Sequence, residues 1–322
     1  MKSSRFRVLG LLVACLGAAA FWWFKTPSPN SGGAGGDGVL ATWVKNRIYS
    51  QISPHEERGF TRLTSENGNG WFAMSNEPIQ SFSFYQSQNP PRPTAARKTI
   101  VLQPLGDFNS EQKRVLRELQ TYCAAFFGLP VRLESALPMP RDPSFRRAKS
   151  GKNSGPGKYQ FSAEKLLYSE LTPRLPSDAA AYLGITMDDL WVKDMSFVFG
   201  VGSIDNRVGV YSLARYFPSH GRKWSEKERQ IGMRRSCQVL NHEMGHMIGI
   251  YHCVLYKCSM NGSNSLADAD SSPLEYCPVC WKKLSWNTGV TREIRSRKLL
   301  DFYREHGLKA EEKWTSAKLR NS

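Results

Sequence analysis

The chain has 322 residues, of which 40% are hydrophobic and 11% are aromatic, a composition that excludes a largely disordered protein and provides for a sizeable core. The 44 basic and 28 acidic residues give a formal net charge of +16, which favours acidic partners such as nucleic acid, anionic lipid or acidic peptides. Because no nucleic-acid-binding motif accompanies this charge, no specific nucleic-acid partner is expected.

The first segment, residues 1–25, has the pattern of a targeting sequence. A basic start (Lys2, Arg5, Arg7) precedes an apolar run at Val8–Phe24, which Lys25 closes. The pattern predicts a cleaved signal peptide or a signal anchor, and both alternatives stay open. Either one predicts a protein that is anchored in the membrane through this segment or enters the secretory pathway, with a cytoplasmic protein as the alternative.

Two segments separate this leader from the compact part of the chain. Residues 26–38 are rich in Gly, Pro and Ser and predict a flexible linker. Residues 39–95 are mixed, carry aromatic clusters around Trp71, Phe82 and Tyr85, and end in the turn-rich stretch QNPPRPT. They predict an irregular leading segment that packs on the main domain.

The compact domain is expected over residues 96–290, and its first half alternates strand and helix signals. The predicted elements are a strand at Thr99–Leu105, a helix capped by Asn109 and Gln112 that runs to Phe127 and stops at Gly128, a short strand at Val131–Leu133, and a helix at Ser162–Leu171. The insert at 141–158, rich in Arg and Lys among Gly, Ser and Pro, predicts a solvated loop rather than a binding patch.

The second half of the domain predicts a hairpin and a long helix. Met195–Val201 is apolar enough for a central strand, and Arg207–Leu213 follows after a turn. Val208–Leu213 is a candidate edge strand that could pair with an extended peptide substrate. Ser225 begins a helix, with Glu228 completing a capping box. Residues 291–322 predict a basic, amphipathic helical tail.

The helix from Ser225 ends in the sequence His242-Glu243-Met244-Gly245-His246. Residues four apart lie on one helical face, so both imidazoles can reach one metal ion with Glu243 beside them. Because a motif of this length also arises by chance, it does not identify a metal site on its own. The alternative is that these histidines are packed in the core and bind no metal.

The continuation makes the motif specific. Gly249 can adopt a left-handed conformation and end the helix, and the chain then returns His252 as a third ligand. Three histidines and a water make a tetrahedral site with an open position, as in catalytic zinc sites, and the full pattern HExxHxxGxxH is that of metzincin peptidases. Glu243 would be the general base toward a zinc-activated water. A zinc-binding but inactive relative is the more serious alternative.

A second metal site is predicted directly after the third histidine. Cys253, Cys258, Cys277 and Cys280 form the pattern C-x4-C…C-x2-C, which suits a closed structural zinc. Two disulfides are the alternative, which an exported chain would permit. A glycosylation sequon at Asn261-Gly262-Ser263 lies inside this region, and a glycan there would crowd the site, which argues against export.

The run HEMGHMIGIYHCVLYKCSM, followed by CPVC, resembles the archaemetzincins, a metzincin branch with an extra four-cysteine zinc. The resemblance covers roughly residues 70–285 and includes the stretches TIVLQPLG and FVFGVGSIDNRVGVYSLARYF. It implies that Met260 lies in a turn beneath the catalytic zinc. The chain departs from the family in a spacer from Met260 to Cys277 that is about one residue short, and in its amino-terminal apolar segment.

Together these patterns predict an α/β protein with a metzincin-like mixed twisted sheet, an active-site helix and a short C-terminal part that holds the second zinc. The expected function is a monomeric zinc metallopeptidase with two Zn²⁺ per chain, acting on peptide or protein substrates. The resemblance implies an aminopeptidase-like or narrow specificity. The alternatives are a catalytically weak, zinc-stabilised peptide-binding module and a zinc hydrolase of a non-peptide amide.

Overall fold

The computed structural model describes residues 39–149, 156–217 and 223–320. The predicted leader (1–25) and linker (26–38) lie outside these residues. Within the described ranges, no helix has both the length and the apolar character needed to cross a membrane.

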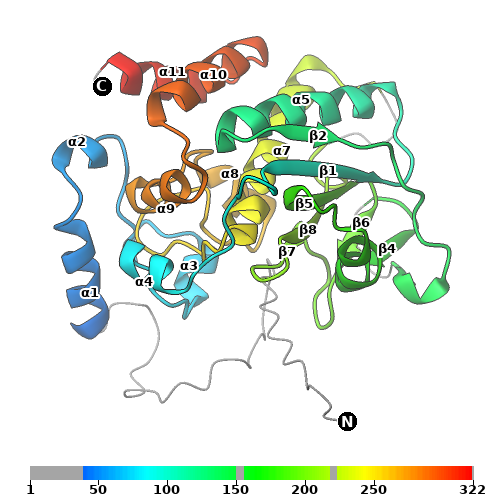
Figure 1. The fold of residues 1–322 in the computed structure, drawn as a ribbon, viewed down its shortest axis with the longest axis horizontal. Coiled ribbons are helices and arrows are strands. Elements are labelled where there is room, and N and C mark those ends of the chain that lie inside the picture. Colours follow the sequence, from blue (N-terminus) through cyan, green and yellow to red (C-terminus); the bar gives the residue numbers. More distant parts are fainter. Residues whose placement is uncertain (1–38, 150–155, 218–222, 321–322) are drawn as a thin grey trace, which may run out of the picture.

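A mixed five-stranded sheet forms the centre of the molecule (Figure 1). Its order is β2-β1-β5-β8-β7, and all neighbouring strands are parallel except β7, which runs antiparallel to β8. The strands are β1 (Thr99–Leu105), β2 (Val131–Leu133), β5 (Ala179–Thr186), β7 (Gly200–Gly202) and β8 (Val208–Ser212). The predicted α/β class with a mixed sheet is confirmed.

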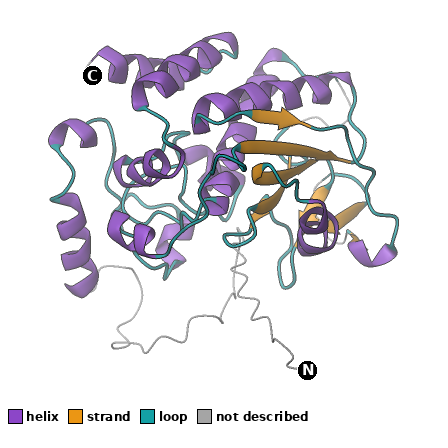
Figure 2. Ribbon diagram, viewed as in Figure 1, coloured by secondary structure: helices purple, strands orange, loops and turns teal. Residues whose placement is uncertain are grey.

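Alternating residues of the strands face two separate cores, because successive side chains of a strand point to opposite faces. Ile100 and Leu102 pack in the larger core with α5 (Ser110–Phe127) and α7 (Glu226–Met247). Val101 lies in the smaller core with the short helix α6 (Ala163–Lys165) and the π-helical turn Leu166–Leu171 that continues it. Helices therefore cover both faces of the sheet (Figure 2).

The strand and helix signals at the start of the domain are confirmed. β1 and β2 have the predicted bounds. The cap of α5 is the reciprocal pair of Asn109 and Gln112, and the helix ends at Gly128, whose φ of 68° is the left-handed conformation that glycine tolerates.

Two strand predictions are wrong. Met195–Val201 is not a central strand, since only its end enters the sheet as β7, at the outer edge next to β8. The central strand is β5, an Ala-rich segment that is buried along its whole length. Nor is Val208–Leu213 an edge, because β8 is hydrogen-bonded to β5 on one side and to β7 on the other.

The basic insert is more structured than a solvated loop. Its first part forms a short 3-10 turn (Pro143–Phe145) and β3 (Arg146–Ala148), which joins β4 (Tyr159–Ser162) and β6 (Asp189–Trp191) in a second sheet. Lys149 forms a buried ion pair with Asp189, which also accepts from the Arg215 guanidinium at 2.7 Å. Some basic residues of the insert therefore form part of the second sheet and of a buried ion pair. Residues 150–155 of the insert lie outside the described part.

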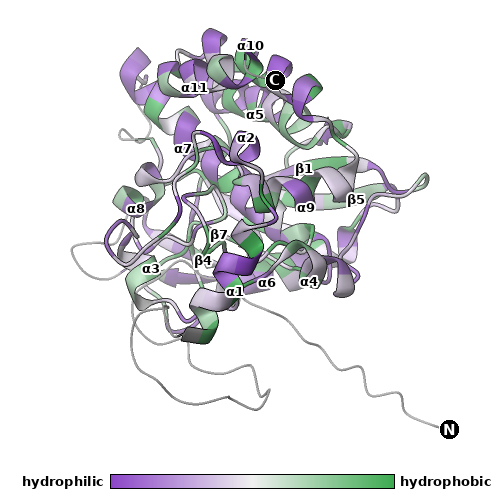
Figure 3. Cartoon of the chain, turned by 90° about the vertical axis from the view of Figure 1, so that its left-hand side faces the viewer, coloured by the Kyte–Doolittle hydropathy of each residue, from purple (hydrophilic) through white to green (hydrophobic). Residues whose placement is uncertain are grey.

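The two ends of the described chain wrap the domain. The leading segment contains α1 (Val39–Tyr49), α2 (Pro54–Glu57), α3 (Gly70–Met74) and α4 (Phe82–Ser87), and the final part contains α8 (Leu266–Ser271), α9 (Pro278–Thr288), α10 (Arg292–Glu305) and α11 (Lys309–Arg320). Leu299, Phe302 and Tyr303 of α10 enter the larger core beside α5, whereas much of the outer surface of α10 and α11 is hydrophilic (Figure 3).

Candidate active site

Helix α7 carries the first two histidines into the interior. Its start is fixed by the predicted capping box, in which Ser225 N donates to Glu228 Oε2 at 2.8 Å and Glu228 N donates to Ser225 Oγ at 3.3 Å. Its end is set by Gly249, whose φ of 86° reverses the chain. The Cβ of any other residue at this position would lie 2.6 Å from Pro90 Cβ. The reversal brings His252 back against α7.

The structure brings the three predicted zinc ligands together. His242 Nε2 lies 3.1 Å from His246 Nε2 and 3.3 Å from His252 Nε2, and the three side chains are buried. A tetrahedral zinc with bonds of about 2.0–2.1 Å places its nitrogen ligands about 3.3 Å apart. These residues, called the three-histidine cluster below, therefore fit a zinc ion.

Each imidazole is oriented by its other nitrogen. His242 Nδ1 lies 3.1 Å from the Ser259 carbonyl oxygen, and His246 Nδ1 lies 2.8 Å from that of Ile250. His252 Nδ1 lies 2.9 Å from Glu77 Oε1. A proton on each Nδ1 leaves the Nε2 lone pair free for a metal. Burial lowers the pKa of His242 to about 3 and that of His246 well below its usual range, so both rings are in the neutral, ligating form.

Glu243 lies beside the cluster in a closed environment. Its side chain is 2% exposed, its Oε2 has no hydrogen-bond partner, and burial raises the pKa of its carboxyl well above the usual range. The backbone of β7 runs against it so closely that a Cβ at Gly200 would lie 2.6 Å from Glu243 Oε1. The carboxylate is thus fixed next to the metal position.

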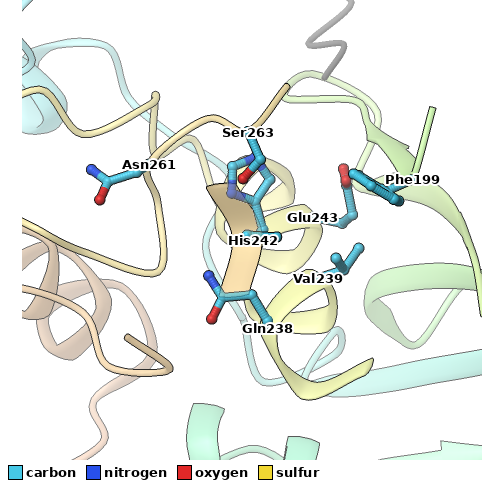
Figure 4. A pocket seen from close by; sticks show the side chains of 8 residues that line it. Phe199, Gln238, Val239, His242, Glu243, Asn261 and Ser263 are labelled. Atoms are coloured by element: carbon cyan, nitrogen blue, oxygen red, sulfur yellow. The ribbon is translucent and has the colours of Figure 1, made fainter. Parts of the chain in front are cut away.

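A small pocket opens beside His242 and Glu243 (Figure 4). Its cavity volume is only about 10 Å³, and its other lining residues are Phe199, Gln238, Val239, Asn261, Ser263 and Ala269. Gln238 is 4% exposed, and its Oε1 has no hydrogen-bond partner. The pocket therefore offers a substrate apolar walls and an unused acceptor.

Met260, which the resemblance places beneath the catalytic zinc, packs against the helix that carries the first two histidines. It is fully buried, and its backbone carbonyl accepts from Cys253 N at 2.7 Å. Its sulfur lies against Gly245, the glycine between the two helical histidines. Tyr276 is also part of this support, because its hydroxyl donates to the Asn241 carbonyl at 2.6 Å. This bond helps to hold α7 in place, and the Tyr251 hydroxyl accepts from the Gln88 amide.

Gly245→Ala is expected to destabilise the protein although alanine is the better helix former. The new Cβ would lie 2.6 Å from Tyr276 Oη and closer still to Met260 Sδ. Overpacking costs about 1–3 kcal/mol, which exceeds the helix-propensity gain of about 1 kcal/mol. Urea unfolding measures the difference, and the double variant Gly245→Ala/Met260→Ala should show coupling, with a loss smaller than the sum of the two single losses. Additive losses would contradict the contact.

The four predicted cysteines also converge. Their Sγ atoms lie within 4.8 Å of one another, and all four side chains are buried. The Sγ atoms of Cys253 and Cys277 are 3.7 Å apart, which matches the roughly 3.8 Å of a tetrahedral zinc with bonds of about 2.3 Å and not the ~2.05 Å of a disulfide. All four are free thiols here. This four-cysteine cluster fits zinc better than the alternative of two disulfides.

Asn261 holds the loop between the two clusters. Its Nδ2 donates to the carbonyls of Cys253 at 2.7 Å and Tyr256 at 2.9 Å, and its Oδ1 accepts from Cys258 N at 2.8 Å. The side chain is 4% exposed. The sequon at Asn261 is therefore a structural element of the fold, with no room for a glycan on its amide nitrogen.

Sequence reasoning missed the residues of the leading segment that reach the site. Glu77 contacts His252, and the Trp71 ring lies edge-on to the His252 ring with their centroids 5.0 Å apart. The aromatic cluster around Trp71 was the available signal in the sequence. Glu77 had none, because it lies 175 positions from the histidine it contacts.

The fold and the three-histidine cluster define a zinc metallopeptidase. A family model described as "Peptidase family M54" matches residues 169–286. Human archaemetzincin-2 is 30% identical to this chain over 270 residues, which cover 75% of the chain and 74% of the relative. The chain belongs to the archaemetzincin family.

Two further comparisons place the chain beside shorter archaeal proteins. Archaemetzincin from Pyrococcus furiosus is 29% identical over 199 residues, which cover 60% of this chain and 95% of the relative. The crystal structure of archaemetzincin from Methanopyrus kandleri is similar with a TM-score of 0.48 and 22% identity, over 62% of this chain and 99% of that one.

Proposed function

We propose that this chain hydrolyses peptide bonds with Glu243 as general base, and that it holds two zinc ions, one in each cluster. The observation that carries the proposal is the placement of Glu243, whose buried carboxylate has an unpartnered oxygen beside three converging imidazoles. A protein that only bound peptides would have no use for such a group, since burying a carboxyl oxygen without a hydrogen-bond partner is costly.

Zinc, when bound, would polarise the scissile carbonyl and lower the pKa of water in the site. Glu243 would accept the proton of the attacking water and return it to the leaving amine. The backbone of β7 at Gly200 keeps the Glu243 carboxylate in place. Because glycine has no side chain, the strand can lie directly against this carboxylate. His242, His246 and His252 would supply three neutral nitrogen ligands and leave one position open for the substrate.

The substrate would lie along β7. This strand is the outer strand of the sheet, and it passes directly beside Glu243. An extended peptide can add to such an edge through backbone hydrogen bonds, while its side chains enter pockets. The pocket at Gln238 lies beside this path, and its small size would favour a substrate with a small side chain there, which supports a narrow specificity.

A mixed peptide library tests this function and its aminopeptidase-like form. The zinc-loaded chain is incubated with peptides that have free or acetylated amino ends, and the products are read by mass spectrometry. We expect cleavage, with loss of the first residue from free peptides and protection of acetylated ones. Cleavage at internal bonds, in peptides with free and with acetylated amino ends alike, would show an endopeptidase in place of an aminopeptidase-like enzyme. No cleavage of any peptide would favour the binding module or a non-peptide amide substrate.

A further inference from the structure

The leading segment contributes to the three-histidine cluster through one side chain. Two of the three imidazoles are held by backbone carbonyls of the chain that follows them. The Ile250 carbonyl, four positions after His246, holds His246, and the Ser259 carbonyl, in the loop after α7, holds His242. The third, His252, has its Nδ1 2.9 Å from a side-chain carboxylate, Glu77 Oε1. This contact joins parts of the chain that are 175 positions apart.

The chemistry of this contact differs from that of the other two. A carboxylate that accepts the Nδ1 proton fixes the tautomer and the ring orientation, and it makes the opposite nitrogen a stronger ligand than a neutral carbonyl does. Metal-ligating histidines are commonly held in this way, and loss of the partner lowers metal affinity about 10–100-fold. His252 is also the ligand that needs such help, because it follows the chain reversal at Gly249 rather than a helix.

The segment that carries Glu77 is bound to the same loop by several further contacts. Gln80 accepts from Tyr251 N at 3.0 Å and donates to the Gly249 carbonyl at 2.9 Å. The Tyr85 hydroxyl donates to the Ile248 carbonyl at 2.7 Å. Residues 77–85 therefore follow the loop from Ile248 to His252, and the position of Glu77 beside His252 is determined by this pairing.

The same segment is tied to the helix of the four-cysteine cluster. Lys283 of α9 is 2% exposed, and its ammonium donates to the Gln80 carbonyl at 2.7 Å and to Gln80 Oε1 at 2.9 Å. Asn287 of α9 donates to the Tyr85 hydroxyl at 2.8 Å. Because α9 begins at Pro278, directly after the ligand Cys277, the segment rests on a part of the chain that the second zinc would hold rigid.

We propose that Glu77 is a positioning residue for the catalytic zinc, which holds His252 in its ligating orientation and raises its affinity for the metal. The inference rests on the proposed zinc occupancy of the three-histidine cluster. It makes residues 77–85 a functional part of the metal site, although they lie outside the stretch that the family model matches, residues 169–286.

Zinc affinity at the two clusters tests the proposal without any substrate. The full-length chain and its variants are titrated with a chromophoric chelator, and the four-cysteine cluster serves as an internal reference. Glu77→Ala should bind zinc at the three-histidine cluster about 10–100-fold more weakly than the parent. Glu77→Gln should lose less, because its amide oxygen can still accept the Nδ1 proton. Affinity at the four-cysteine cluster should be unchanged in both, and so should the thermal transition measured with the three-histidine cluster empty of metal.

Glu66→Gln is the matched control, since Glu66 is an exposed carboxylate of the same leading segment. It should leave both affinities unchanged. Equal affinity of Glu77→Ala and the parent at the three-histidine cluster would overturn the positioning role and leave the proposed function intact. A parent that binds zinc only at the four-cysteine cluster would overturn the proposed function, and this inference with it.

Discussion

Cys258→Ser is expected to release the zinc of the four-cysteine cluster and to lower the thermal transition by about 10 °C or more. The Cys258 sulfur is fully buried among the other three and accepts from Cys277 N at 3.2 Å. Structural zinc binds with about 10–16 kcal/mol in small zinc domains, and loss of a thiolate ligand removes much of this. The cluster connects the loop after His252 with α9, so this part of the chain should lose its packing.

The control for this prediction is the same substitution at an equally buried thiol. Cys123 lies in α5, outside the cluster. Cys123→Ser should cost about 1–3 kcal/mol for the buried hydroxyl and should lose no zinc. Zinc per chain and thermal unfolding are measured on both variants. If Cys258→Ser kept the full zinc content and melted like Cys123→Ser, the cluster would not be a structural zinc site.

Glu243→Gln should lower kcat/KM about 10²–10⁴-fold while both zinc ions stay bound. The amide has nearly the shape of the carboxylate and fits beside Gly200, but it cannot accept the proton of the attacking water. The protein should be as stable as the parent or slightly more so, because burial already disfavours the charged form of Glu243.

Glu228→Gln, the same substitution on the same helix, is the control for Glu243→Gln. Glu228 lies in the capping box at the start of α7, in the first turn of the helix. Its replacement should cost at most about 1 kcal/mol and leave kcat/KM unchanged. A Glu243→Gln variant that retained a third or more of the parent activity would exclude Glu243 as general base.

Sequence signals that involve only a few neighbouring residues, such as helix caps, correctly predicted the helices that they belong to. The caps at Asn109 and Ser225 and the stop at Gly128 are local, so the sequence located α5 and the start of α7. The convergence of the three histidines could be predicted for the same reason. Helical spacing places His242 and His246 on one face, and a glycine at 249 predicts the reversal that returns His252.

Features that depend on tertiary contacts were not predictable. β5 is the central strand although it begins with Ala179-Ala180-Ala181, residues with little preference for strands, because the sheet buries it on both faces. Met195–Val201 has the stronger strand composition, yet only its end joins the sheet, as the edge strand β7. Glu77 is a similar case, since nothing near it in the sequence indicates a contact with His252.

The central claim is that one cluster holds a catalytic zinc and the other a structural zinc. The most direct measurement follows cleavage of a library-derived peptide and the far-ultraviolet circular dichroism of the same sample during titration with a chelator. We expect removal of one zinc equivalent to abolish cleavage while the circular dichroism is unchanged, and removal of the second to reduce the helical signal as the loop after His252 and α9 lose their packing. Cleavage that persisted after the first equivalent had left, with the three-histidine cluster empty, would contradict the central claim.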